Sequence, residues 1–206
     1  MMKMKTKIFL GIVTLVTLLT VSVMSSSVEI QKSAVSTPVH VIHYGLIASY
    51  TTGDNLAGVL YGTEWFAQSF KPTVDATVNK IKLKCCKSIS SGNDRCTVGP
   101  LIVSIRNSLT GEDVAVGSVD GDSLQTTYCW FSVPINSVGV TEGTTYYVVI
   151  RAPEAGGPTQ AYVQLCIDST GDYADGQYWV SIDGGLSWGD NGNPEGDMLF
   201  QVWGCY

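Results

Sequence analysis

Short runs of apolar residues recur along most of the chain, and from about Gly58 onward the pattern is that of β-strands. Each run is four to ten residues long, is rich in Val, Ile, Tyr, Phe and Trp, and is bounded by Gly, Pro, Asn or Asp. The predicted strands cover residues 65–70, 77–86, 100–107, 129–135, 144–153, 161–168, 177–183 and 197–206.

Several of these runs alternate between apolar and polar positions, which separates the two faces of a strand. Ile81, Leu83 and Cys85 share one face of the run at 77–86, and the other face carries Lys80, Lys82 and Lys84. No window carries an apolar stripe with helical spacing over three turns. Eight to ten short strands without intervening helices predict an all-β, antiparallel fold, either a two-sheet sandwich or a barrel.

The first residues have the order of a secretory signal. Lys3, Lys5 and Lys7 precede an apolar stretch over 8–24, and small serines follow at 25–27. A retained membrane anchor is the alternative, but seventeen residues is the lower limit for a bilayer span. We therefore expect residues 1–27 to be a cleaved signal peptide, the mature protein to be secreted or at the cell surface, and no membrane association after cleavage.

Residues 28–57 are interpreted as a lead-in to a single domain at 58–206. The lead-in contains one alternating run, VHVIHYGLI at 39–47. An extended segment of this kind can add a strand to the sheet of a neighbouring subunit, so homo-assembly through residues 38–48 is one prediction. The alternative is that the segment pairs with its own domain as an ordinary first strand.

Charge argues against nucleic-acid binding. The chain has 12 basic and 18 acidic residues, and three of the basic ones lie in the signal, so nine basic residues face eighteen acidic ones in the mature protein. Such a surface repels a phosphate backbone.

The cysteines predict three disulfides, because an exported chain carries six of them, at positions 85, 86, 96, 129, 166 and 205. Zinc is disfavoured, since there is no CxxC pair. Sequence alone permits fifteen pairings. One expected scheme joins one of the vicinal Cys85–Cys86 pair to Cys96, the other to Cys205, and Cys129 to Cys166.

The most specific short motif is Ser181-Ile-Asp183-Gly184-Gly185-Leu-Ser187-Trp188, which matches the Asp-box S-x-D-x-G-x-[ST]-W of sialidases and related β-propellers. The glycines permit positive φ in a tight turn, and Asp183 can accept hydrogen bonds from the turn amides. A propeller would repeat the unit. It occurs once here, so Asp183 is predicted to be structural.

A wider resemblance covers residues 58–206. Its motifs begin with W-F-A-Q-S-F-x-P at 65–72, V-x-K-I-x-L at 78–83 and G-T-T-Y-Y-V-V at 143–149. They continue with Tyr173-x-x-Gly176, the Asp-box, and D-x-x-F-x-V-x-G at 197–204. Together these motifs resemble jelly-roll β-sandwich modules of secreted bacterial and archaeal surface proteins, of the galactose-binding-like or carbohydrate-binding-module-like type. The resemblance implies a jelly-roll sandwich and a carbohydrate ligand.

The candidate chemistry favours binding over catalysis. The chain lacks recognisable hydrolase, P-loop and dinucleotide motifs, and its two histidines, His40 and His43, would lie on opposite faces of a strand. Sugars bind flat aromatic faces, and the candidates are Tyr173, Tyr178, Trp179, Trp188 and Trp203. Tyr173, Tyr178 and Trp188 are the predicted ligand-binding residues, with at least half of the candidates expected to be core.

Three aspartates suggest one optional cofactor. Asp168, Asp172 and Asp175 lie in one Gly- and Asp-rich loop, and oxygen ligands of this kind suit Ca²⁺ if they converge. We therefore expect a non-catalytic glycan-binding module, with no obligatory cofactor and an optional calcium site. The alternative is a structural subunit of an extracellular layer or filament.

Overall fold

A computed structural model of the chain describes residues 41–90, 96–171, 173–190 and 196–206. The predicted signal peptide lies outside these residues. The compact unit that contains the sheets runs from His40 to Tyr206. Within the described part, no helix is long and apolar enough to cross a membrane.

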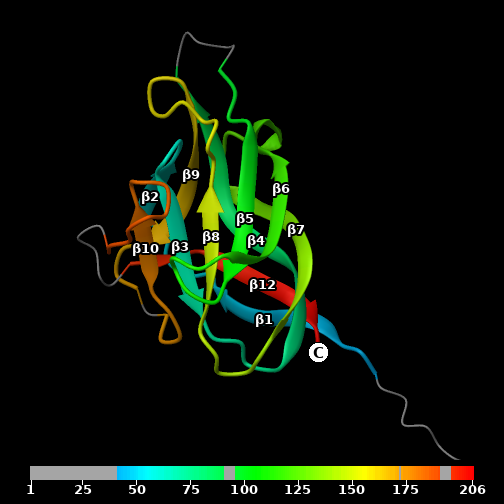
Figure 1. Ribbon diagram of the computed structural model, residues 1–206. Coiled ribbons are helices and arrows are strands. Elements are labelled where there is room, and N and C mark those ends of the chain that lie inside the picture. The colour runs from blue at the N-terminus through cyan, green and yellow to red at the C-terminus, as the bar shows by residue number, and fades with distance from the viewer. Residues whose placement is uncertain (1–40, 91–95, 172, 191–195) are drawn as a thin grey trace, which may run out of the picture. The chain divides into compact units, whose positions relative to one another are not determined.

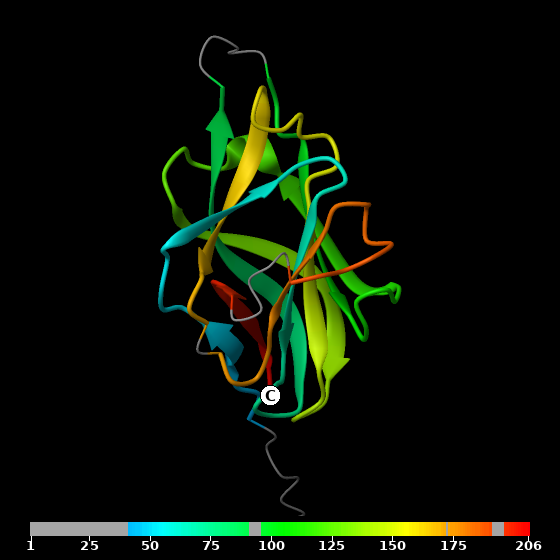
Figure 2. The same cartoon turned by 90° about the vertical axis from the view of Figure 1, so that its left-hand side faces the viewer.

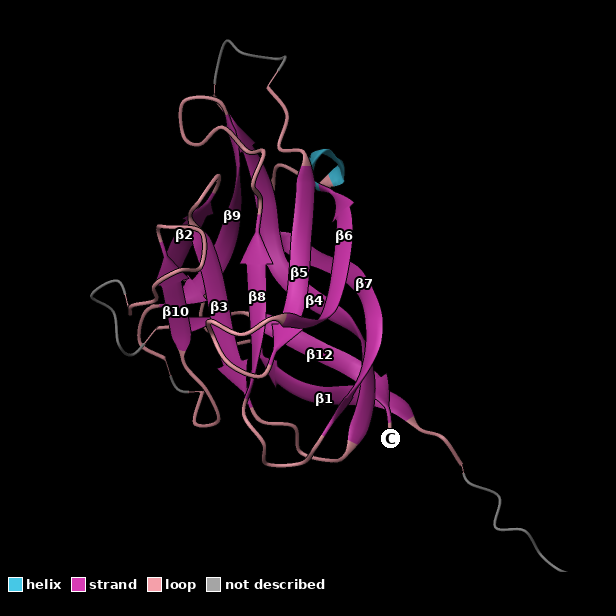
Figure 3. Ribbon diagram, viewed as in Figure 1, coloured by secondary structure: helices cyan, strands magenta, loops and turns pink. Residues whose placement is uncertain are grey.

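The described chain forms twelve β-strands and one short 3-10 turn, η1 (Gly121–Ser123), with no α-helix (Figures 1 and 3). The first six strands are β1 (Tyr44–Tyr50), β2 (Leu56–Leu60), β3 (Trp65–Phe70), β4 (Ala76–Ile89), β5 (Pro100–Arg106) and β6 (Asp113–Asp120). The remaining six are β7 (Cys129–Val140), β8 (Tyr146–Arg151), β9 (Ala161–Asp168), β10 (Tyr178–Ser181), β11 (Asp197–Met198) and β12 (Phe200–Cys205).

These strands build two antiparallel sheets that pack as a sandwich. Five strands form one sheet in the order β10-β3-β8-β5-β6. The other seven form a sheet along the path β1-β12-β4-β9-β11, with β2 paired to β9 and β7 paired to β4. Figure 1 shows the five-stranded sheet in front of the other. The all-β antiparallel fold predicted from the sequence is confirmed, and the sandwich is the architecture adopted.

Strand β4 organises the seven-stranded sheet. It is fourteen residues long and pairs with β7 along one side and with β12 and then β9 along the other. Its inward side chains, including Ile81, Leu83 and Cys85, are fully buried, as the alternation in the sequence predicts.

The core between the sheets is apolar, and aromatic rings lie at its centre. Phe70 and Phe200 are both completely buried, and their ring centroids are 6.2 Å apart across the two sheets. Full burial of each such side chain contributes about 2–3 kcal/mol relative to exposure.

A buried amide also links the sheets. Gln68 on β3 donates from Nε2 to Oδ1 of Asp197 on β11 over 2.8 Å, and its Oε1 accepts the backbone N–H of Met198 over 2.7 Å. The other carboxylate oxygen of Asp197 accepts the backbone N–H of Tyr173. Because buried polar groups are costly unless they are paired, this set of bonds specifies one relative position of β3 and β11.

The two lateral edges of the sandwich differ in whether another strand lies against them. At one side, β6 lies against β7, and a Cβ at Gly117 would come within 1.9 Å of the Pro134 carbonyl oxygen. Only glycine permits this approach of two backbones. At the other side, β1 pairs with β12 and has no second strand partner in the described residues.

The expected lead-in is part of the sheet. Residues 44–50 pair with β12 of the same chain, and β2 begins at Leu56, within the segment assigned to the lead-in. Strand β1 is therefore an ordinary first strand of its own domain, which was the alternative considered for this segment.

Strand β6 was not predicted from the sequence. Its residues Val114 and Val116 face solvent at a sheet edge, and they are too few to give a clear apolar run.

The strand register corrects the expected disulfide scheme. All six cysteines are free thiols. Cys205 lies opposite Thr77 on β4, eight residues and about 26 Å along the strand from Cys85, so it cannot bond the vicinal pair. Cys85 pairs with Cys129 on one side and with Leu165 on the other, which puts Cys129 and Cys166 two strand spacings, about 10 Å, apart. That link is also wrong.

We expect Cys85 and Cys129 to be the pair that forms a disulfide. They are direct cross-strand partners, a position where Cα atoms are about 4.5–5.5 Å apart, within the range for a disulfide. The partly exposed Cys129 thiolate should attack oxidised glutathione, forming a mixed disulfide and releasing one reduced glutathione. The Cys85 thiolate then attacks the Cys129 sulfur, which forms the Cys85–Cys129 bond and releases the second glutathione. Burial raises the pKa of the Cys85 thiol, so the reaction should accelerate at alkaline pH.

Peptide mapping of the oxidised protein checks this pairing, with Cys129→Ser as the control that cannot form it. The new bond closes a loop of about 45 residues and should stabilise the fold by about 4 kcal/mol in the chain-entropy model. A map that places Cys85 with any other cysteine would show the assignment to be wrong.

Candidate ligand-binding face

Six side chains form a continuous aromatic, amide and basic surface on the outer side of the seven-stranded sheet. We name it the lysine–tryptophan face and define it by Tyr44, Asn79, Lys80, Lys82, Gln201 and Trp203. Three adjacent strands, β1, β12 and β4, supply these residues. The sheet, rather than a loop, therefore sets their spacing.

Strand alternation turns these side chains outward. On β12, Phe200 and Val202 are fully buried in the core, so the residues between and after them, Gln201 and Trp203, face out. The register then pairs Trp203 with Lys80 and Gln201 with Lys82 on β4.

The two rings lie close together beneath the lysine ammonium groups. Tyr44 and Trp203 have centroids 6.2 Å apart with an interplanar angle of 24°. The Lys80 Nζ is 5.0 Å from the Tyr44 centroid and 4.9 Å from that of Trp203, and the Lys82 Nζ is 5.1 Å from Trp203. These distances are those of cation–π contacts, so the rings help to hold both charges in place.

Two amides border the rings. The Tyr44 hydroxyl donates to Oδ1 of Asn79 over 3.3 Å, and the indole Nε1 of Trp203 donates to Oε1 of Gln201 over 3.0 Å. Both amides accept through their oxygens, and among the described residues neither NH₂ group donates a side-chain hydrogen bond, so both can serve a ligand as donors.

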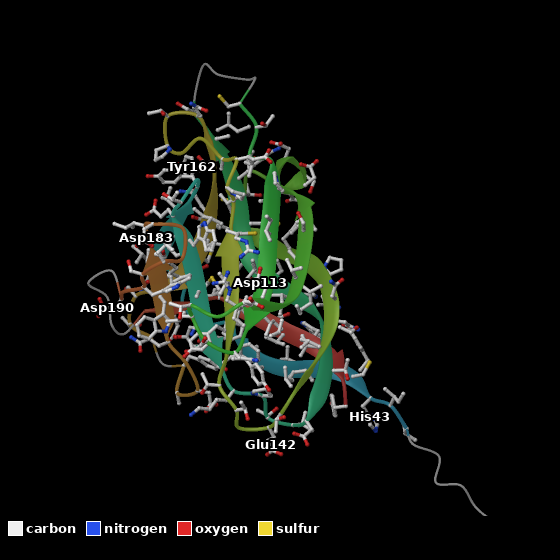
Figure 4. The ribbon with its side chains drawn as sticks, viewed as in Figure 1. His43, Asp113, Glu142, Tyr162, Asp183 and Asp190 are labelled. Carbon is white, nitrogen blue, oxygen red and sulfur yellow. The ribbon has the colours of Figure 1, made fainter. Side chains whose placement is uncertain are left out.

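An open groove continues the same surface toward Ile42 and the C-terminal Tyr206. Two residues beyond Trp203, Cys205 faces Thr77, and both line a groove of about 670 Å³ together with Ile42, Asp75, Thr141 and Tyr206. Tyr206 and His43 exchange backbone hydrogen bonds, and their rings stack at 5.9 Å. Figure 4 places His43 at this end and Tyr162 at the opposite end.

The aromatic residues predicted to bind ligand lie elsewhere, and one of them is core. Tyr178 is 4% exposed and stacks on Phe66 at 5.6 Å, because it points inward from β10. Its ring is therefore part of the core rather than an exposed stacking surface. Tyr173 is half-buried between Tyr50 and Phe200, and Trp188 is half-buried beside the Asp-box turn. Trp203, from the wider set of candidates, is the one on the exposed face.

Two of the aspartates considered for calcium lie in the described residues, and their surroundings differ. Asp168 is buried and accepts hydrogen bonds from the Tyr50 hydroxyl and from the backbone and hydroxyl of Thr170. These bonds, with Tyr50 the largest contributor, lower the pKa of the Asp168 carboxyl. Asp175 is exposed, and Asp172 lies outside the described residues. Within the described ranges, no three acidic, cysteine or histidine side chains gather as a metal site would require.

Residues 181–188 form a hydrogen-bonded turn. Asp183 accepts the Ser187 backbone N–H over 2.9 Å and the Ser187 hydroxyl over 2.6 Å, and Ser181 Oγ bonds both Asp183 and the Gly185 amide. Gly184 and Gly185 have φ of 76° and 87°. The amide acceptance expected from the sequence is thus present. Figure 4 places Asp183 at the β10 edge, on the side away from His43.

A second cation–aromatic cluster, over the five-stranded sheet, is held by ion pairs. The guanidinium groups of Arg106 and Arg151 lie 5.7 and 5.1 Å from the Trp65 centroid, and both form ion pairs with Asp113. Burial alone would raise the pKa of Asp113, but the hydrogen bonds from Arg151 and Arg106 hold it below its usual value. Each guanidinium of this cluster therefore has a carboxylate partner.

Comparison with known proteins does not identify a family: no protein-family model matches the chain, and no curated protein matches it.

The Asp183 turn generates a pH-dependent prediction. Hydrogen bonds from Ser187, and then from Ser181, lower the pKa of Asp183 to about 2. A lowered folded-state pKa means that the ionised carboxylate stabilises the fold above its unfolded pKa near 4, and that this contribution is lost as pH falls toward 2. Asp183→Asn should therefore melt below wild type at pH 7, and the gap should close between pH 4 and pH 2.

Thermal melts followed by circular dichroism across this range provide the measurement. Asp175→Asn, which changes an exposed aspartate in a neighbouring loop, is the control and should melt as wild type does at pH 7. A gap that stays constant down to pH 2 would refute the role given to Asp183.

Proposed function

We propose that the protein is a non-catalytic, secreted or surface-exposed glycan-binding module whose ligand lies on the lysine–tryptophan face. The observation that carries this proposal is the pair of neighbouring rings, Tyr44 and Trp203, on the outer side of a sheet with amide groups beside them. The signal-like start of the chain supports an extracellular location.

The chemistry of the face matches what a pyranose requires. The C–H side of a sugar ring is apolar enough to pack on an aromatic face, and its hydroxyls need donors and acceptors at the rim. Trp203 and Tyr44 supply the rings, while Asn79 and Gln201 supply amides. Because these side chains stand on three paired strands, little order has to be created on binding.

The architecture supports the same interpretation. A two-sheet antiparallel sandwich is the fold of the galactose-binding-like and carbohydrate-binding modules that the sequence resembles. Fold alone does not determine a ligand, so the proposal depends on the face and not on the sandwich.

Removal of the indole provides the test. Trp203→Ala should weaken glycan binding at least tenfold, about 1.4 kcal/mol or more, because it deletes the larger stacking surface. A glycan array followed by calorimetry on the best ligand measures this. Trp188→Ala tests the loop position predicted from the sequence, and Leu186→Ala is a neutral exposed control. Full affinity in Trp203→Ala would exclude this face as the site.

A second function is favoured by the exposed start of the described chain. Val41 and Ile42 are 62% and 68% exposed, and Leu46 on β1 is 42% exposed. In the described part, β1 pairs on one side only. An apolar segment at an open sheet edge suits strand addition by a second copy, as in an extracellular filament or layer.

Analytical ultracentrifugation and electron microscopy test this assembly. If the edge assembles, Val41→Lys should leave only monomer, because a charge at a strand edge opposes pairing. The same variant should keep its glycan affinity, since Val41 is not part of the lysine–tryptophan face. A wild-type protein that is monomeric at all concentrations would eliminate the second function.

A further inference from the structure

The charge of the lysine–tryptophan face is opposite to that of the protein as a whole. Beyond residue 27 the chain has eighteen acidic and nine basic residues. Three of those nine, Lys80, Lys82 and Lys84, stand in one row on the outer side of β4. A solvated surface of this protein would therefore be expected to be acidic, and this row is an exception.

Protection of a sheet edge does not account for the row. Lysines commonly occupy edge strands, where they prevent pairing with other chains. Strand β4 is internal: its residues from Lys80 to Lys84 pair with β7 on one side, and those from Lys80 to Leu83 pair with β12 on the other. The lysines need another explanation.

Only one member of the row is neutralised within the described residues. Lys84 forms an ion pair with Asp54, with 2.6 Å between Nζ and Oδ2. Lys80 and Lys82 form no ion pair with a carboxylate in the described part of the chain, and their Cα atoms are about 6.6 Å apart on the same face. The arginines over Trp65 differ, because both form an ion pair with Asp113.

The two free ammonium groups and the indole together define a binding geometry. Both Nζ atoms lie about 5 Å from the Trp203 centroid, at 4.9 and 5.1 Å. A single anion could therefore contact both lysines while the sugar ring that carries it packs on the indole. Charge-assisted hydrogen bonds of this kind are stronger than neutral ones.

We infer that the ligand is an acidic glycan, in which a carboxylate or sulfate group on a pyranose is bound by Lys80 and Lys82 while Trp203 stacks on the ring. This inference rests on the proposed function and narrows its ligand class. Asn79 and Gln201 then contact neighbouring hydroxyls, and Asp75 in the adjoining groove disfavours an anion there. The anion is thereby confined to the lysine pair.

The test compares polymers that differ in charge. Polygalacturonate supplies carboxylates, dextran sulfate supplies sulfates, and unmodified dextran and galactan are neutral. Calorimetry on the full chain should give at least one acidic polymer an affinity about tenfold or more above the neutral polymers, falling as salt increases. The two acidic arms distinguish which anion is preferred.

The variant is Lys80→Gln combined with Lys82→Gln. It should reduce affinity for the acidic polymer about tenfold or more, because it removes both charged donors. Lys71→Gln, which removes an exposed lysine outside the face, should change affinity less than about twofold. Thermal melts verify that each variant folds, which is expected since these side chains point outward.

The other possible results would overturn either the acidic ligand or the proposed function. Equal affinity for acidic and neutral polymers, sensitive to Trp203→Ala, would overturn the acidic ligand and retain the proposed function. Acidic binding that survives Trp203→Ala, or that is matched by duplex DNA, would show general attraction of polyanions and overturn the inference. Absence of binding to any glycan would overturn the proposed function itself.

Discussion

The alternation of side chains along β4 is the constraint on which both the core and the candidate site depend. Ile81, Leu83 and Cys85 fill the space between the sheets, and the intervening lysines are thereby forced outward. Because β7, β12 and β9 all pair with this strand, its register determines the positions of the others. A slip of one residue would bury three lysines and expose the core positions at once.

Two clusters combine cations with tryptophan, and the presence of a carboxylate separates their roles. Over Trp65, Asp113 forms ion pairs with both Arg106 and Arg151, and the group links β3, β5, β6 and β8. Over Trp203, the two lysines form cation–π contacts, and neither forms an ion pair with a carboxylate in the described residues. Both cations of the first cluster are thus paired with a carboxylate of the fold, whereas those of the second are open to an anionic ligand.

Sequence reasoning predicted the fold better than the site, for a physical reason. Local alternation and turn residues specify strands, so β3 and β9 fall at their expected bounds and the Asp183 turn closes as expected. The lysine–tryptophan face joins residues 44, 80, 82 and 203, which only cross-strand register brings together. The alternating lysines were visible as a polar face, but nothing local showed that Trp203 lies opposite them. Tyr178 was misplaced for the same reason, because the inward side of β10 is decided by its pairing with β3.

The antiparallel pairing of β1 with β12 also determines how the fold would respond to mechanical load. Tyr44 pairs with Cys205, so the start of β1 and the end of β12 leave the sheet side by side (Figure 2). A force that pulls these two ends apart acts across the strands, and it breaks their hydrogen bonds one after another instead of straining them all together. The pair would therefore unzip at low force. Tension applied through the two ends would separate Tyr44 from Trp203 early, dismantling the aromatic platform while β4 and the core remained folded.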